Sequence, residues 1–227
     1  MNAINATLYE KLSFSFIKEL APVASVVRFP NVMAVNASFP AKTVPEFIAY
    51  AKANPGKISQ ASSGTGTTQH LAGELFKMRT GVDFVHIPYK GGGQAITDLI
   101  SGQVQVAFES LPVSIQHIKS GKLRALGVTT ATRSELLPEL PTISEFVASY
   151  EASGWTGLVA PKNTPVAIIE RLNKLTNEGL AEPKLRARLA DLGATPVRGS
   201  PSDFGRLIAD ETEKWAKVIR ANNIKVG

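Results

Sequence analysis

Short apolar runs alternate with amphipathic helical segments through the middle of this chain, and this order constrains the fold more than any other feature. In chain order the expected elements are a helix from Thr43, a strand at 58–61, a helix through Leu71, a strand at 82–88, a helix at 94–101, a strand at 104–108, a helix at 113–120 and a strand at 123–128. Strands separated by helices this short form a sheet with parallel strands and helices on its faces. The sequence therefore predicts an α/β fold.

The C-terminal third has apolar helical stripes but few strands. A strand is expected at 154–159, and Thr164-Pro165 and Ser200-Pro201 are typical helix starts. We expect the first helix to bury Val166, Ile169, Leu172 and Leu175, and the last to bury Phe204, Leu207, Ile208, Trp215 and Ile219. Only residues 195–197 and the strand near Trp155 are available as sheet around them, so a sheet missing from this sequence is the simplest explanation.

Residues 61–70, ASSGTGTTQH, form the most informative segment, because they follow a strand and enter a helix. Glycines let the backbone approach a ligand closely, hydroxyls donate hydrogen bonds, and free amides at a helix start favour anions. The predicted ligand-binding residues are Ser62, Ser63, Gly64, Thr65, Gly66, Thr67 and His70. A polar turn without a ligand is the alternative. The segment matches neither the phosphate loop nor the dinucleotide fingerprint.

A second glycine-rich loop, Tyr89-Lys90-Gly91-Gly92-Gly93-Gln94, repeats the order of strand, loop and helix. Loops of consecutive units lie side by side at the carboxyl ends of parallel strands, where ligands bind in open α/β sheets. Tyr89, Gly91, Gly92 and Gly93 are therefore added to the predicted site. Glu109 and Ser110 end the next strand and should face the same edge.

The sequence offers little for catalysis. Its three histidines have no spacing typical of metal ligands, and no Gly-x-Ser-x-Gly elbow is present. A dyad of Ser62 or Ser63 with His70 has no obvious orienting carboxylate, so we expect His70 to be a neutral hydrogen-bond donor. We predict a binding protein with no metal or cofactor. An α/β enzyme acting on a small carboxylate or phosphate compound is the alternative.

Composition narrows the class of partner. The net charge is +6 and the pI about 9.5, but the basic residues form no patch interleaved with aromatic residues, so nucleic acid is not expected as a partner. Cysteine is absent, which suits an exported protein. No apolar run is long enough for a membrane span, and Met1–Thr7 does not have the pattern of a signal peptide.

At several motifs the sequence resembles the Bug-type receptors of tripartite tricarboxylate transporters. The motifs are SSGTGTTQHLAGELF at 62–76, HIPYKGG at 86–92, TDLISGQV at 97–104, GKLRAL at 121–126, LPT at 140–142 and GLVAP at 157–161. They occur in the family's order, and the resemblance extends over essentially the whole chain. The family's opening strand and first glycine-rich loop have no counterpart here.

The resemblance implies a two-lobed fold like that of type II periplasmic binding proteins, with the first lobe truncated at its N-terminus. Residues 1–35 would be a remnant of the first lobe with a crossover strand, 36–153 a complete second lobe, and 154–227 the return crossover and C-terminal helices of the first lobe. The implied function is periplasmic capture of a small carboxylate, such as a di- or tricarboxylate, an amino acid or an aromatic acid. The implied partners are membrane components of the transporter, with no direct membrane insertion. We further expect the truncated chain to bind carboxylates weakly or not at all.

Overall fold

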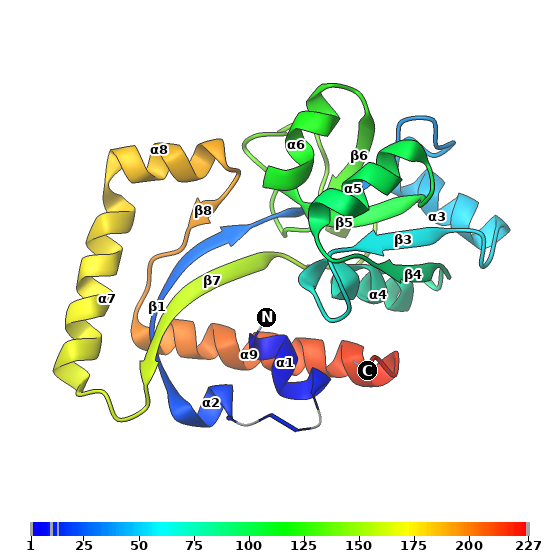
Figure 1. Cartoon of the computed structure of the whole chain (residues 1–227). Coiled ribbons are helices and arrows are strands. Elements are labelled where there is room, and N and C mark those ends of the chain that lie inside the picture. The colour runs from blue at the N-terminus through cyan, green and yellow to red at the C-terminus, as the bar shows by residue number, and fades with distance from the viewer. Residues whose placement is uncertain (1, 10, 13, 226–227) are drawn as a thin grey trace. The chain divides into compact units, whose positions relative to one another are not determined.

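The computed structural model describes residues 2–9, 11–12 and 14–225 and divides the chain into two compact units (Figure 1). Unit 1 combines Met1–Phe29 with Trp155–Gly227, and unit 2 is Pro30–Gly154. Met1, Glu10, Ser13, Val226 and Gly227, which belong to the expected segments 1–35 and 154–227, lie outside the described residues.

Unit 2 is built on a five-stranded sheet with the order β4-β3-β5-β2-β6. Its elements are β2 (Asn31–Asn36), α3 (Val44–Ala53), β3 (Ser59–Ser62), α4 (Thr68–Thr80), β4 (Val85–Pro88), α5 (Gly92–Ser101), β5 (Val106–Ser110), α6 (Leu111–Lys119), β6 (Leu123–Val128) and the 3-10 helix η1 (Ile143–Glu145). β3 pairs in parallel with both β4 and β5, as the alternation predicted. β2 lies between β5 and β6 and is antiparallel to both.

Local sequence explains where the helices of unit 2 begin and end. The hydroxyl of Thr43 caps α3 by accepting from the amide of Glu46, and Thr67 caps α4 in the same way through the amide of His70. Gly81 ends α4 in the left-handed conformation that glycine adopts without strain. α5 starts at Gly92, two residues before the predicted start at 94, because Gly91 serves as its N-cap.

The helices cover the unit 2 sheet with large apolar side chains. Phe47, Phe76 and Phe108 are fully buried, and the ring of Phe76 lies 6.0 Å from that of Phe47 and 5.6 Å from that of Phe108. A second cluster packs α5 against the sheet through Ile96 and Leu99. This packing fixes the strand ends from which the loops of the candidate site emerge.

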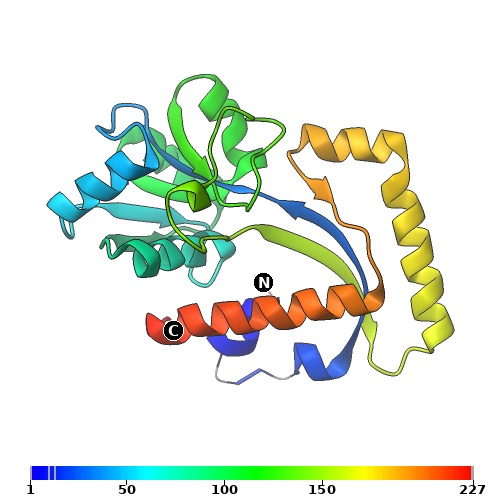
Figure 2. The same cartoon turned by 180° about the vertical axis from the view of Figure 1, so that it is seen from behind.

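Unit 1 has a three-stranded sheet with the order β7-β1-β8. Its elements are α1 (Asn2–Leu8), α2 (Phe16–Glu19), β1 (Leu20–Phe29), β7 (Gly154–Pro161), α7 (Val166–Ala181), α8 (Pro183–Asp191), β8 (Thr195–Pro196) and α9 (Pro201–Ala221). α7 and α9 both pack on β1, and α8 continues from α7 at a sharp corner (Figure 2). The two expected strands near Trp155 and 195–197 are present as β7 and β8.

The expected burial of the two long helices is confirmed for one and largely wrong for the other. Ser200 caps α9, whose Phe204, Ile208, Trp215 and Ile219 are buried. On α7 only Ile169 of the predicted stripe is buried, whereas Val166 is 71 %, Leu172 41 % and Leu175 48 % exposed. Ile169 packs against Val23, Ala24 and Ala160 of the narrow sheet, and three strands present too little surface to cover the rest of the stripe.

Candidate functional site

Three consecutive strand-loop-helix units of unit 2 end at one edge of its sheet. The strands β4, β3 and β5 are neighbours and run in the same direction, so their carboxyl ends, Pro88, Ser62 and Ser110, lie along that edge. The two predicted glycine-rich loops and the Glu109–Ser110 pair therefore converge. The sequence placed these residues together for the right topological reason.

The first loop, residues 63–67, is held by bonds within itself. Gly64 has φ +129° and Gly66 has φ +75°, conformations that a side chain would strain. The amide of Gly64 donates to Ser62 Oγ at 3.2 Å, and the hydroxyl of Thr67 donates to the Gly64 carbonyl at 2.7 Å. Most donors that the sequence suggested for a ligand are therefore engaged by the loop.

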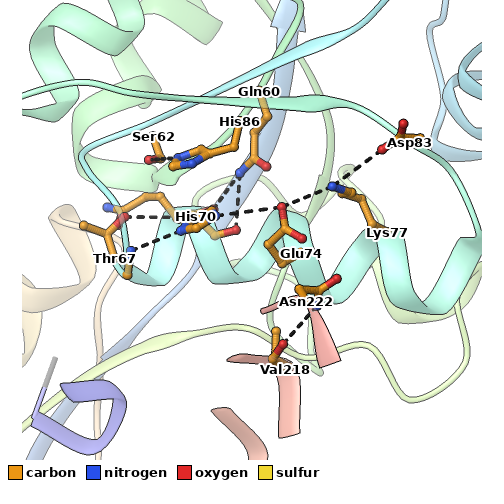
Figure 3. A network of polar contacts seen from close by, with 12 residues as sticks. Gln60, Ser62, Thr67, His70, Glu74, Lys77, Asp83, His86, Val218 and Asn222 are labelled. Carbon is orange, nitrogen blue, oxygen red and sulfur yellow. Dashed lines mark hydrogen bonds and ion pairs between the residues drawn. The ribbon is translucent and has the colours of Figure 1, made fainter. Parts of the chain in front are cut away.

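Two stacked histidines support this loop from behind (Figure 3). The rings of His70 and His86 lie 3.6 Å apart at an interplanar angle of 8°. The amide of Gly66 donates to His70 Nδ1 at 3.1 Å, and His86 Nε2 lies 2.6 Å from Ser62 Oγ. His70 is thus an acceptor at Nδ1, so its proton resides on Nε2. The expectation of a donor holds only for that second nitrogen.

Burial keeps both rings neutral. Desolvation, with smaller contributions from His86 and Lys77, lowers the pKa of His70 from 6.5 to about 3. Desolvation and then Lys77 lower the pKa of His86 from 6.5 to about 4. A neutral His70 can accept the Gly66 amide proton, whereas a protonated ring cannot. The loop conformation therefore depends on His70 staying uncharged.

The polar network continues along α4 to Glu74 and Lys77 (Figure 3). Glu74 Oε1 lies 3.8 Å from His70 Nε2 and 3.3 Å from Lys77 Nζ, and Lys77 also pairs with Asp83 at 3.6 Å. Burial raises the pKa of Glu74, and the nearby Lys77 partly offsets this. Sequence analysis assigned no role to His86 or Glu74. The spacing of four residues between His70 and Glu74 on one helix face was the available signal.

The second loop leads into a helix start without a side-chain cap. Gly91 is the N-cap of α5 and donates or accepts no side-chain capping bond, so the first amides of α5 have no partner within the helix. The hydroxyl of Tyr89 donates to Asp98 Oδ2 at 2.7 Å. Desolvation, and then this bond, raise the pKa of Tyr89 to about 12. The phenol is therefore turned to α5, and the backbone amides are the donors left at this loop.

Glu109 lies at the centre of the edge and is 2 % exposed. Its Oε1 accepts from the Gln69 side chain at 3.0 Å and from the Ser110 amide at 2.7 Å, and its Oε2 accepts from the Ser63 hydroxyl at 3.2 Å. Glu109 thus connects the first loop to the start of α6. Sequence analysis placed Glu109 at this edge but did not foresee that Ser63 and Gln69 turn toward it.

The site has one contact of the kind found in nucleophilic enzymes. Ser62 pairs with His86, not with His70 as the sequence-based alternative required, and Ser62 is fully buried. Among the described residues no carboxylate forms a hydrogen bond with His86. In the same part of the chain no three His, Asp or Glu side chains are grouped so that they could hold a metal ion. No helix among the described residues has the length and apolar character to cross a membrane.

Comparison with known proteins gives the family. The chain matches the model of the tripartite tricarboxylate transporter family receptor over residues 2–224. It is 36 % identical to Protein BugT of Bordetella pertussis over 225 residues, covering 99 % of this chain and 69 % of that protein. It is 35 % identical to the UPF0065 protein in the tcbD-tcbE intergenic region of Pseudomonas sp. strain P51, covering 95 % of this chain but only 65 % of the relative.

Solved structures agree with this match. Rpa4515 of R. palustris with adipate superposes with a TM-score of 0.88 at 35 % identity, covering 99 % of this chain and 75 % of that one. The periplasmic binding protein BugD gives a TM-score of 0.81 at 31 % identity, covering 99 % and 76 %. MatC of Rhodopseudomonas palustris with bound malate gives 0.82 at 27 % identity, covering 96 % and 76 %. The chain therefore has the α/β fold of these periplasmic binding proteins and belongs to the tripartite tricarboxylate transporter receptor family.

Proposed function

We propose that this chain acts as an extracytoplasmic receptor that captures a small carboxylate for a tripartite tricarboxylate-type transporter. Family membership supports this function, as do relatives whose structures contain adipate and malate. We further propose that unit 1 and unit 2 are the two lobes of such a receptor, with segments 1–35 and 154–227 in one lobe and 36–153 in the other. Unit 1 would then be the truncated lobe, and the membrane components of the transporter would be the partners.

One observation carries the choice of site: the uncapped start of α5 at the edge where three loops converge. The amides of Gly92, Gly93 and Gln94 have no intrahelical acceptor, and Gly93 and Gln94 are exposed. Such amides bind carboxylate oxygens without requiring a lysine or arginine. We propose that the ligand carboxylate is held here, with Ser62, Ser63, Gly64, Thr65, Gly66, Thr67, His70, Tyr89, Gly91, Glu109 and Ser110 forming its surroundings.

A binding role also suits the internal bonding of the first loop better than an enzymatic one does. A nucleophile must reach its substrate, but Ser62 is fully buried and its hydroxyl is shared between His86 and Gly64. A rigid, internally bonded loop favours recognition with little ordering cost on binding. The proposal therefore excludes turnover of the captured carboxylate.

The test is calorimetry with adipate, malate and tricarboxylates, and with adipamide as an uncharged control. Substituting Gly93 separates binding from folding, because a Cβ at Gly93 meets no atom within 4 Å. Gly93→Asp places a negative charge in the first turn of α5, which favours the helix but repels a carboxylate. We expect Gly93→Asp to weaken binding at least tenfold, equivalent to about 1.4 kcal/mol, and the isosteric Gly93→Asn to weaken it much less.

Two results would contradict the proposal. Equal affinity in Gly93→Asp and Gly93→Asn would show that the carboxylate binds elsewhere. Equal heats for adipate and adipamide would show that charge is not recognised. A chain extended upstream by the family's first strands, measured in parallel, should bind more tightly, because the opposing lobe would then be complete.

A further inference from the structure

Glu109 is a buried carboxylate whose partners are all uncharged. It is 2 % exposed, and among the described residues no lysine, arginine or histidine forms an ion pair with it. A carboxylate in such a place is costly unless hydrogen bonds and fixed dipoles stabilise its charge. The surroundings of Glu109 supply both.

Three helix starts converge on this one side chain. Gln69, in the first turn of α4, donates to Oε1, and so does the amide of Ser110, the N-cap of α6. Gly92, the first residue of α5, is so close that a Cβ built on it would lie 2.9 Å from Oε2. Each helix start has a partial positive charge, and carboxylates near it are stabilised. Glu109 therefore occupies the point where these three dipoles meet.

The glycine at 92 is an independent sign that this position is built around the carboxylate. A Cβ there would also lie 3.2 Å from Cδ of Glu109, whereas Cβ atoms on Gly91 and Gly93 would meet nothing within 4 Å. Of the three consecutive glycines, only Gly92 is required by a neighbouring side chain. The second loop is thus shaped to Glu109 as closely as the first.

We propose that Glu109 is a resident anion: it fixes the spacing of the three loops and takes the position that a ligand carboxylate would otherwise fill. The bound solute then lies outside Glu109, against the free amides of α5, and Glu109 acts as a positioning residue through Ser63, Gln69 and Gly92. This refines the proposed function, on which its account of the ligand rests. Direct contact between Glu109 and the ligand, expected from sequence, is replaced by this indirect role.

The test replaces the resident anion with a free one. Glu109→Ala removes the carboxylate and leaves space for a two-carbon molecule, so sodium acetate should restore stability. We expect Glu109→Ala to lower Tm by about 5 °C or more. Acetate at roughly 50 mM should recover at least half of that loss. Acetamide, which has nearly the same shape without charge, and sodium gluconate, which is too large for the space, should not.

Matched variants complete the design. Glu139→Ala removes an exposed glutamate of the same unit and should change neither Tm nor the response to acetate. Rescue by acetamide as good as by acetate would show a filled cavity and no need for charge, and would overturn the proposal. An unchanged Tm in Glu109→Ala would overturn it as well.

A second measurement covers the case in which Glu109→Ala does not fold. Glu109→Gln keeps the shape, and amide hydrogen exchange in residues 63–69 and 89–94 should then be about tenfold faster than in the wild type, with the rest of unit 2 unchanged. Unchanged exchange would refute the positioning role. Both experiments are done without ligand, so their outcome is independent of whether the wild-type chain binds carboxylates.

Discussion

Gly92→Ala should destabilise unit 2, although alanine normally favours a helix over glycine. Gly92 is the first residue of α5, and its φ is not among the positive values found for other glycines of the chain. The backbone at Gly92 therefore accepts alanine without strain. The only obstacle is the Glu109 carboxylate, since the new Cβ would lie 2.9 Å from Oε2.

The magnitude follows from what Glu109 must give up to move. Its carboxylate accepts from Ser63, Gln69 and the Ser110 amide. Losing one bond to a charged group costs about 1.5–3 kcal/mol. The gain from alanine in the helix offsets about 0.5–1 kcal/mol of this. Gly92→Ala should therefore lower the free energy of unfolding by about 1–2 kcal/mol.

Gly93→Ala is the matched control, because a Cβ at Gly93 meets nothing within 4 Å. It should raise the free energy of unfolding by up to about 1 kcal/mol. The assay is urea denaturation followed by circular dichroism, with both variants also made in a Glu109→Ala background. Without the carboxylate, Gly92→Ala should become as favourable as Gly93→Ala. Equal effects of the two glycine substitutions in the wild-type background would refute the reasoning, since the Glu109 contact would then cost nothing.

Two further predictions concern other parts of the molecule. Because burial lowers the pKa of His70 from 6.5 to about 3, the unfolded chain takes up a proton below pH 6.5 that the folded chain does not. The free energy of unfolding should therefore fall as pH drops from 6.5 toward 3, by up to about 1.4 kcal/mol per unit; urea denaturation should show a flatter slope in His70→Gln than in His117→Gln, and equal slopes would contradict it. In unit 1, Gly157→Ala would place a Cβ 2.2 Å from the Phe204 ring and should cost about 2 kcal/mol or more by the same assay, whereas Gly179→Ala, with nothing within 4 Å, should be neutral or stabilising; equal costs would refute this.

Sequence alone predicted those parts of the fold that are set by local signals. α9 was predicted because Ser200 can cap it and its apolar residues recur at helical spacing, and both features are present. β2 was not placed, because its antiparallel pairing with β5 and β6 joins residues far apart in sequence. Likewise, the exposure of Leu172 depends on how wide a sheet lies beneath α7, which no local pattern records.

The candidate site shows the same division. Glycine spacing and strand order located both loops, since parallel strands bring successive loops to one edge. The direction of the polar side chains could not be predicted. Ser63 and Gln69 turn inward because Glu109, 40 residues beyond Gln69 in the chain, offers an acceptor there. Similarly, His70 accepts a bond from Gly66 because stacking and burial hold it neutral.

The division of the chain into its two units has a consequence for the order of folding during synthesis. Unit 2 is one continuous stretch, Pro30–Gly154, whereas unit 1 needs both ends of the chain. The Ser25 hydroxyl of β1, for example, donates to the carbonyl of Val197, 172 positions later. Unit 2 can fold as soon as it leaves the ribosome. The N-terminal strand, although made first, must wait with its apolar residues unpaired until the last third of the protein has been synthesised.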